Sequence, residues 1–209
     1  MNSNIDINNQ LTAMRVNTLN FNLDNAINSF LLFYIGYDAV TGAEERGYCD
    51  VVASDVVNVF NGEFPSLSDD TKKTIEAFIL STFNLYKKDI RQTIEEKLAP
   101  IRNAISLGEE VNEELLIEAT NKITASAGEN YNKHVESLLS EIAKYSSDND
   151  GYIRNYLYQD VFSKIIRVLE NKLSSTMGVT KNSFDESADG LKLIDKTNAE
   201  ILANVQKVA

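Results

Sequence analysis

Apolar residues recur with a helical spacing over most of this chain, and the clearest case is residues 151–177. There the apolar side chains cover most of the circumference of a helix with about 3.6 residues per turn. A helix that is apolar on nearly every side must be covered by several other helices. The pattern therefore predicts a buried central helix that starts after Asp150 and ends at Gly178. Its narrow polar strip consists of Asn155, Gln159, Ser163, Arg167, Glu170 and Ser174.

A second apolar seam, with apolar side chains every three or four positions, predicts a long helix over residues 68–106. Ser68 and the two aspartates that follow it mark the start, because a hydroxyl caps free amides and acidic groups oppose the helix dipole. Pro100 removes one amide donor inside the pattern, so we expect a kink or a break there. The seam consists of Ile79, Phe83, Tyr86, Ile90, Ile94, Leu98, Ile101 and Ile105.

The remaining sequence carries further helix signals. Residues 24–37 are an apolar run that ends near Gly36, and a buried strand is the competing interpretation of it. Patterns of the capping-box type predict helix starts at Thr41, Ser106 and Ser183. Together these signals predict an all-α bundle of five to six helices.

The two ends of the chain look different from the middle. Nine of the first 28 residues are asparagine, whose side chain competes for backbone hydrogen bonds, so we expect an irregular N-terminal arm over residues 1–22. The bundle is expected over residues 23–178. A linker and a C-terminal helical appendage are expected over residues 179–209.

Both ends carry apolar side chains on faces that are too narrow to be stable alone. We therefore interpret these side chains as candidates for contact with other subunits. The candidates are Ile5, Ile7, Leu11, Ile194, Ile201 and Val205.

Composition and charge restrict the class of protein. Hydrophobic residues make up 43% and charged residues 24% of the sequence, as in ordinary folded domains. The net charge of −11 argues against a surface that binds nucleic acid or anionic membranes. Neither a secretory signal nor an apolar run of about 20 residues is visible, so we expect no membrane span and a cytoplasmic or virion location.

Catalytic and metal-binding patterns are weak. One cysteine, Cys49, and one histidine, His134, exclude an internal disulfide, a cysteine-based zinc site and the paired histidines of di-iron bundles. The loop at residues 148–151 has the acidic spacing of an EF-hand, but Leu157 stands where a bidentate glutamate is needed. Tyr152, with its neighbouring tyrosines, fits a bundle rim as well as a ligand pocket.

A cluster of glutamates at residues 109–118 is the strongest remaining chemical candidate. Glu110 and Glu113 resemble the E-x-x-E half of the metal site of all-α nucleotide pyrophosphohydrolases. The E-x-x-D half is missing from the next helix, and acidic residues at a helix N-terminus are favoured by the dipole in any case. We therefore assign no catalytic, cofactor-binding or metal-binding residue.

These absences predict a non-enzymatic structural or assembly subunit of a larger homo- or hetero-oligomer, with protein partners and no direct nucleic-acid contact. A phage virion component, such as a head–tail connector or ring protein, is the form that we favour. Two other hypotheses stay open. One is an acidic nucleic-acid mimic that inhibits a DNA-handling enzyme, and the other is an all-α magnesium-dependent hydrolase.

Overall fold

The computed structural model describes residues 2–145 and 150–208. Helices make up most of these residues, and no β-strand occurs among them. For residues 2–8 and 150 and for most of residues 191–208 only the backbone path is described. The all-α bundle predicted from the sequence is confirmed. The helices are α1 (Asn2–Ile35), α2 (Tyr48–Glu63), α3 (Asp69–Ser106), α4 (Glu113–Ile142), α5 (Asp150–Asn155), the π-helical segment η1 (Tyr156–Val161) and α6 (Phe162–Val208).

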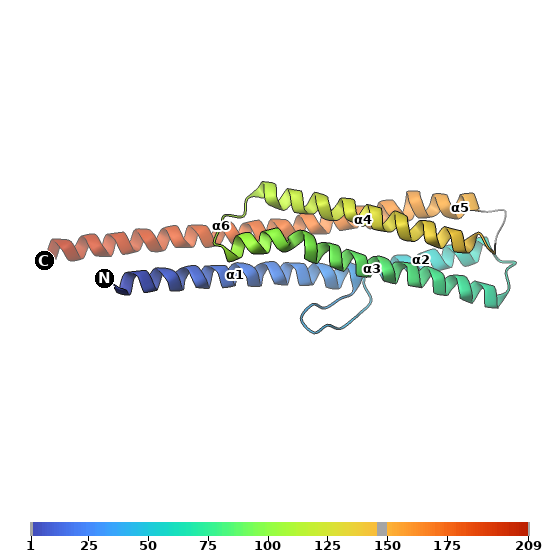
Figure 1. The fold of residues 1–209 in the computed structure, drawn as a ribbon, viewed down its shortest axis with the longest axis horizontal. Helices are drawn as coiled ribbons and strands as arrows, with labels where there is room; N and C mark the ends of the chain where they lie inside the picture. Colours follow the sequence, from blue (N-terminus) through green and yellow to red (C-terminus); the bar gives the residue numbers. More distant parts are fainter. Residues whose placement is uncertain (1, 146–149, 209) are drawn as a thin grey trace.

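The long helices lie side by side and form an elongated bundle (Figure 1). Around the bundle α1 packs on α3, α3 on α4, α4 on α6, and α6 on α1. Helices α5, η1 and α6 follow one another without a loop and form one rod. Helix α6 packs between α1 and α4, whereas α5 contacts α4 and η1 contacts α2. Residues 151–177 therefore lie at a corner of the bundle and not at its centre as expected.

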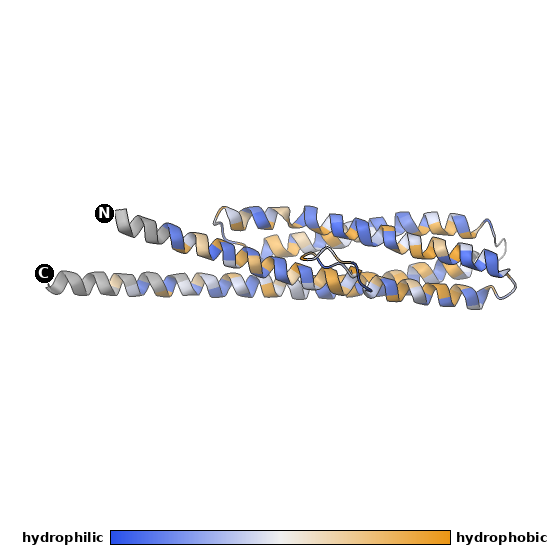
Figure 2. Ribbon diagram, turned by 90° about the horizontal axis from the view of Figure 1, so that it is seen from below, coloured by the Kyte–Doolittle hydropathy of each residue, from blue (hydrophilic) through white to orange (hydrophobic). Residues whose placement is uncertain are grey.

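The core lies between the inner faces of these helices, where the apolar residues gather (Figure 2). Each member of the seam predicted for α3 is at most 2% exposed. Ser68 caps this helix as predicted, because its hydroxyl oxygen accepts a hydrogen bond of 3.2 Å from the amide of Thr71. Helix α3 continues through Pro100 to Ser106, so of the kink or break expected at the proline, the break does not occur.

The first helix contradicts the expected irregular arm. Helix α1 starts at Asn2 and runs without a break to Ile35, although asparagine is a poor helix former. Its inner face buries Leu19, Leu23 and Ile27 against neighbouring helices. Burial of an apolar face outweighs intrinsic propensity in a helix of this length.

Residues 36–47 leave the helical path and return to it almost at the same point. The backbones of Gly36 and Gly47 lie so close that a Cβ on Gly47 would be 2.3 Å from the Gly36 nitrogen. Helix α2 then begins at Tyr48, and not near Thr41 as predicted. The reason is that the Asp38 carboxylate accepts hydrogen bonds from the Thr41 amide and hydroxyl, which hold Thr41 in a turn.

Two other predicted helix starts also lie elsewhere. Helix α3 ends at Ser106, and α4 begins at Glu113, where the side chain of Asn112 accepts a hydrogen bond of 2.9 Å from the amide of Leu115. At Ser183, the other predicted start, no new helix begins. Helix α6 continues through Gly178 and Ser183 to Val208, so the linker expected after Gly178 does not occur. One glycine in a helix costs only about 1 kcal/mol, which the burial of side chains beyond it offsets.

Candidate protein-interaction surface

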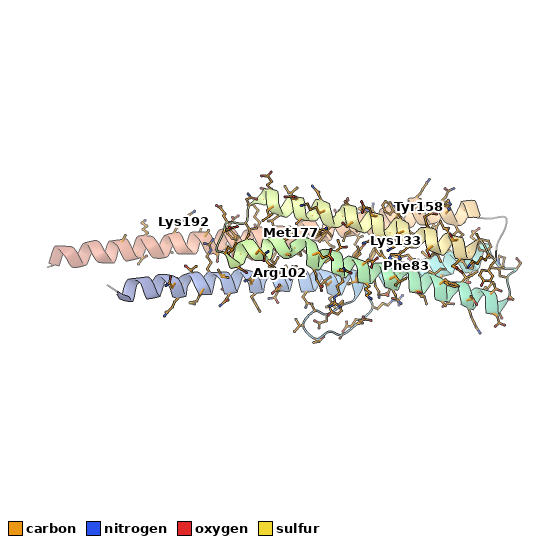
Figure 3. All side chains as sticks on the ribbon, in the orientation of Figure 1. Phe83, Arg102, Lys133, Tyr158, Met177 and Lys192 are labelled. Carbon is orange, nitrogen blue, oxygen red and sulfur yellow. The ribbon has the colours of Figure 1, made fainter. Side chains whose placement is uncertain are left out.

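Both ends of the chain project past the loop that joins α3 and α4, on the same side of the molecule (Figure 1). Figure 3 marks Lys192 on the projecting part of α6 and Met177 within the bundle. The two helices run antiparallel, and the guanidinium of Arg15 lies 4.9 Å from the ring centre of Phe184. Phe184 is only 4% exposed, so the core extends to this contact between the ends.

The outer face of α1 carries exposed apolar side chains. Met14 is 66% exposed and Phe21 is 65% exposed, which are high values for large apolar side chains. They belong to a row spaced by three and four residues, which we name the outer seam. The outer seam consists of Leu11, Met14, Thr18, Phe21 and Asn25; Leu11 is half-buried and the other members are exposed.

The charged side chains of α1 do not lie on this seam. From residue 9 onward the only charged residues of α1 are Arg15 and Asp24. Arg15 stacks on Phe184, and Asp24 accepts an ion-paired hydrogen bond of 2.9 Å from Arg102 of α3. The exposed face of a bundle helix is normally charged, so an uncharged outer face is typical of a surface that contacts another protein.

A groove of about 480 Å³ runs along the same side of the molecule, between α1 and α6. Asn22 and Ser29 line it from α1, and Ser175 and Val179 line it from α6. At one end the ammonium of Lys172 lies 4.4 Å from the ring centre of Phe33. Lys172 is the one charged residue among those that line the groove. The groove thus extends the uncharged surface of the outer seam.

Charge is distributed unevenly along the chain. Residues 1–23 contain one acidic and one basic residue, and residues 178–209 contain five acidic residues and four lysines. The two ends are therefore close to neutral. Nearly all of the net charge of −11 lies in residues 24–177, the body of the bundle.

The structure places the residues predicted for subunit contact on the two projecting helices. Leu11 is part of the outer seam. Ile5 and Ile7 are on α1, and the side chains of these two residues lie outside the described part of the structure. The same is true of the side chains of three residues on α6, which are Ile194, Ile201 and Val205.

Phe21 is a surface residue that sequence reasoning missed. The signal was present in the alternating steps of three and four residues from Leu11 to Asn25. This spacing was hard to recognise because the polar residues Thr18 and Asn25 interrupt it. In addition, when a helix has apolar residues on two faces, its sequence does not show which face the neighbouring helices cover.

The chemical candidates do not form a reactive site. The glutamates at residues 109–118 are exposed, and the described residues include no group of three His, Cys, Asp or Glu side chains that could hold a metal ion. Cys49 is fully buried, and burial raises the pKa of its thiol. His134 contacts the Asp89 carboxylate at 2.7 Å, as a cross-link between α4 and α3. Of the loop at 148–151, residues 148 and 149 lie outside the described part.

Tyrosines on the rod formed by α5, η1 and α6 make contacts that stabilise the fold. Tyr158 donates a hydrogen bond of 2.6 Å to Glu136 of α4, whose carboxylate also accepts one of 2.8 Å from Arg154. These hydrogen bonds, that of Arg154 first, lower the pKa of the Glu136 carboxyl. Tyr152 is half exposed.

No helix in the described part of the chain combines the length and the apolar character of a membrane span. Comparison of the chain with protein-family models, with curated proteins and with solved structures found no match. The functional argument therefore rests on the surface described above.

Proposed function

We propose that this chain is a non-enzymatic subunit of a larger protein assembly and that it docks through the projecting ends of α1 and α6. The observation that carries the proposal is the exposure of Met14 and Phe21 on a helix face without charge. Large apolar side chains that are exposed on one face of a helix, here two turns apart, are typical of contact sites on proteins. A virion component such as a head–tail connector or ring protein is one form of such an assembly.

Two physical arguments support docking through the ends. A helix that projects from its bundle gains little burial, and a single helix in water is only marginally stable. A partner that covers the apolar face supplies the missing burial. The charge distribution also favours contact through the ends. The acidic body repels other acidic surfaces, whereas the nearly neutral ends do not.

The alternatives have less support. A nucleic-acid mimic needs carboxylates in a continuous stripe, spaced like phosphates. Here several exposed carboxylates are paired with cations, as in Lys122–Glu118, Arg91–Glu95 and Lys181–Asp185. A magnesium-dependent hydrolase needs a cluster of carboxylates that could hold the ion, and the described residues do not provide one.

The proposal is tested by the mass of the native particle. The tagged full-length chain is produced in cells of its source, cross-linked mildly and measured by mass photometry. We expect a particle of defined mass well above the 23.3 kDa of one chain. A chain that stays at 23.3 kDa under these conditions would contradict the proposal.

Variants locate the contact. The pair Ile201→Asp and Val205→Asp is expected to abolish the particle while far-ultraviolet circular dichroism and the melting temperature stay unchanged. The matched control is Leu85→Asp on α3, because Leu85 is apolar and 49% exposed but lies away from the ends. We expect the control to leave the particle intact. Equal effects of the two variants would count against docking through the ends.

A further inference from the structure

We propose that a pocket between α3 and the loop at residues 36–47 binds a phosphate group. The loop projects from the bundle beside α3 (Figure 1), and the pocket of about 400 Å³ lies where the two meet. Figure 3 marks Phe83, the residue before Asn84 of the pocket, in the body of the bundle. The pocket is therefore separate from the projecting ends that carry the proposed docking surface. Asn84, Lys87, Lys88 and Arg91 line it from α3, and Tyr37 and Glu44 line it from the loop.

The side chains from α3 place positive charge on one face of the helix. Asn84, Lys88 and Arg91 are separated by four and three residues, the spacing that puts helical side chains on the same side. Lys87 lies next to this row. Three cations and one carboxylate, that of Glu44, thus line a pocket in a chain whose net charge is −11. A local excess of cations on an acidic body attracts anions to this point.

Two of these cations are held in position by the fold. The ammonium of Lys87 lies 2.6 Å from the Asp50 carboxylate of α2. The Nε of Arg91 donates a hydrogen bond of 3.1 Å to Glu95, and the guanidinium lies 3.8 Å from the centre of the Tyr37 ring. Side chains that are fixed before a ligand arrives lose less conformational entropy when it binds. Asp50 and Glu95 also neutralise part of the charge, so binding relies on the donors that these carboxylates leave unused.

Three side chains in the pocket keep unused hydrogen-bond donors. The two terminal nitrogens of Arg91 donate to no described residue, since its ion pair uses Nε. Lys88 is exposed, and its ammonium pairs with no carboxylate in the described part of the chain. The side-chain amide of Asn84 has no hydrogen-bond partner among the described residues either. A phosphate group accepts hydrogen bonds through three oxygens, so it complements this set of donors.

The donors favour a phosphate over a carboxylate or a halide. The planar guanidinium of Arg91 presents adjacent N–H groups that match two oxygens of a phosphate, and Lys88 adds a point charge. A group with nearly two negative charges gains more from these cations than a carboxylate with one. The volume of about 400 Å³ leaves room for a small organic group attached to the phosphate. Ile35 also lines the pocket and offers that group an apolar contact.

Glu44 opposes the ligand and therefore provides the sharpest test. The backbones of Glu44 and Tyr37 form an isolated antiparallel bridge, which holds both residues at the pocket. The Glu44 carboxylate repels a phosphate and competes with it for Lys88 and Arg91. Glu44→Gln removes this charge at an exposed position, so we expect it to strengthen phosphate binding severalfold. Damage to the fold does not produce a gain of binding.

Isothermal titration calorimetry of the full-length chain with inorganic phosphate, at low ionic strength, measures the binding. We expect the heat to saturate with phosphate and not with sodium chloride at matched ionic strength. Lys88→Gln is expected to raise the Kd about fivefold, the upper value for one exposed charge contact. The matched control is Lys73→Gln, because Lys73 is also an exposed lysine of α3 without an ion pair in the described part. The control is expected to keep the Kd of the parent.

A phosphomonoester identifies the source of the phosphate group. Tighter binding of glucose 6-phosphate than of inorganic phosphate would support the site and assign it to a small phosphorylated metabolite. Weaker binding of the ester, with saturation by inorganic phosphate, would support the site and assign it to the free ion. Far-ultraviolet circular dichroism checks that each variant keeps its helicity.

Three results would overturn the proposed site. The first is a parent chain that neither probe saturates. The second is an equal Kd for Lys88→Gln and Lys73→Gln, and the third is a Glu44→Gln variant that binds phosphate no better than the parent. The mass of the particle in the source plays no part in this test, so loss of the phosphate site would leave the proposed function standing.

Discussion

The hydroxyl of Tyr131 on α4 donates a hydrogen bond of 2.7 Å to the carbonyl oxygen of Leu157 in η1. The same carbonyl accepts the amide of Phe162, five residues further along, as in a π-helix. On the other side of the rod the hydroxyl of Tyr34 on α1 donates to the carbonyl of Ile165 at 3.1 Å. Two buried tyrosines thus hold the rod from its two neighbours and fix its rotation about its own axis.

The change Tyr131→Phe tests this bond. It removes the hydroxyl and leaves the ring packed between Tyr86 and Phe162. We expect the free energy of unfolding to fall by about 1 kcal/mol, the net value of one intramolecular hydrogen bond. Urea unfolding followed by circular dichroism measures it. Tyr145→Phe is the control, because Tyr145 is 40% exposed, and equal effects of the two changes would contradict the role of Tyr131.

Alkaline pH is expected to destabilise the fold. Burial raises the pKa of Tyr34, Tyr86, Tyr131 and Cys49 in the folded chain. In the unfolded chain these groups ionise near their ordinary pKa values, about 8.5 for Cys and about 10 for Tyr. The unfolded state therefore loses protons first, and the stability that is fully present below about pH 8.5 falls as the pH rises further.

The melting temperature measured between about pH 7 and pH 11 checks this expectation. A flat profile across that range would show that the four groups ionise equally well in the folded chain. The variant Tyr86→Phe is expected to lose part of the decrease above pH 10, because it removes one of the groups whose pKa is raised.

Phe184→Ala tests whether the core extends past residue 180. The ring is 4% exposed and lies under Arg15 of α1, so its removal is expected to cost about 3 kcal/mol. Leu193→Ala, at a side chain that is 66% exposed, is the matched control and is expected to change stability by less than about 0.5 kcal/mol. Thermal and urea unfolding distinguish the two. A neutral Phe184→Ala would mean that the C-terminal helix is an appendage after all.

Gly36→Ala tests the junction between α1 and α2. Gly36 has a φ of 72°, and a Cβ there would lie 2.0 Å from the backbone oxygen of Glu45. Gly42 has the same φ but open space around it. The left-handed conformation costs an alanine about 1–2 kcal/mol at either position, so we expect Gly36→Ala to be clearly more destabilising than Gly42→Ala. Equal losses would show that the close approach at Gly36 relaxes without cost.

The sequence by itself determined the class of fold and the faces that are buried in its strongest helices. The seam of α3 and the Ser68 cap were predictable because both depend on local spacing and local hydrogen bonds. The contact role of Leu11 was read from the same kind of local spacing, and it stays a prediction. An apolar side chain on a face that cannot be buried alone is visible from the sequence.

Tertiary structure decided where the helices end and which face of α1 stays outside. Gly178 ends no helix, because neighbouring helices continue beside it and bury Thr180 and Phe184. Helix α1 has one apolar face through Leu23 and another through Met14 and Phe21, and local spacing does not rank them. Packing on α3 and α6 takes the first face, so the second is left exposed as the outer seam.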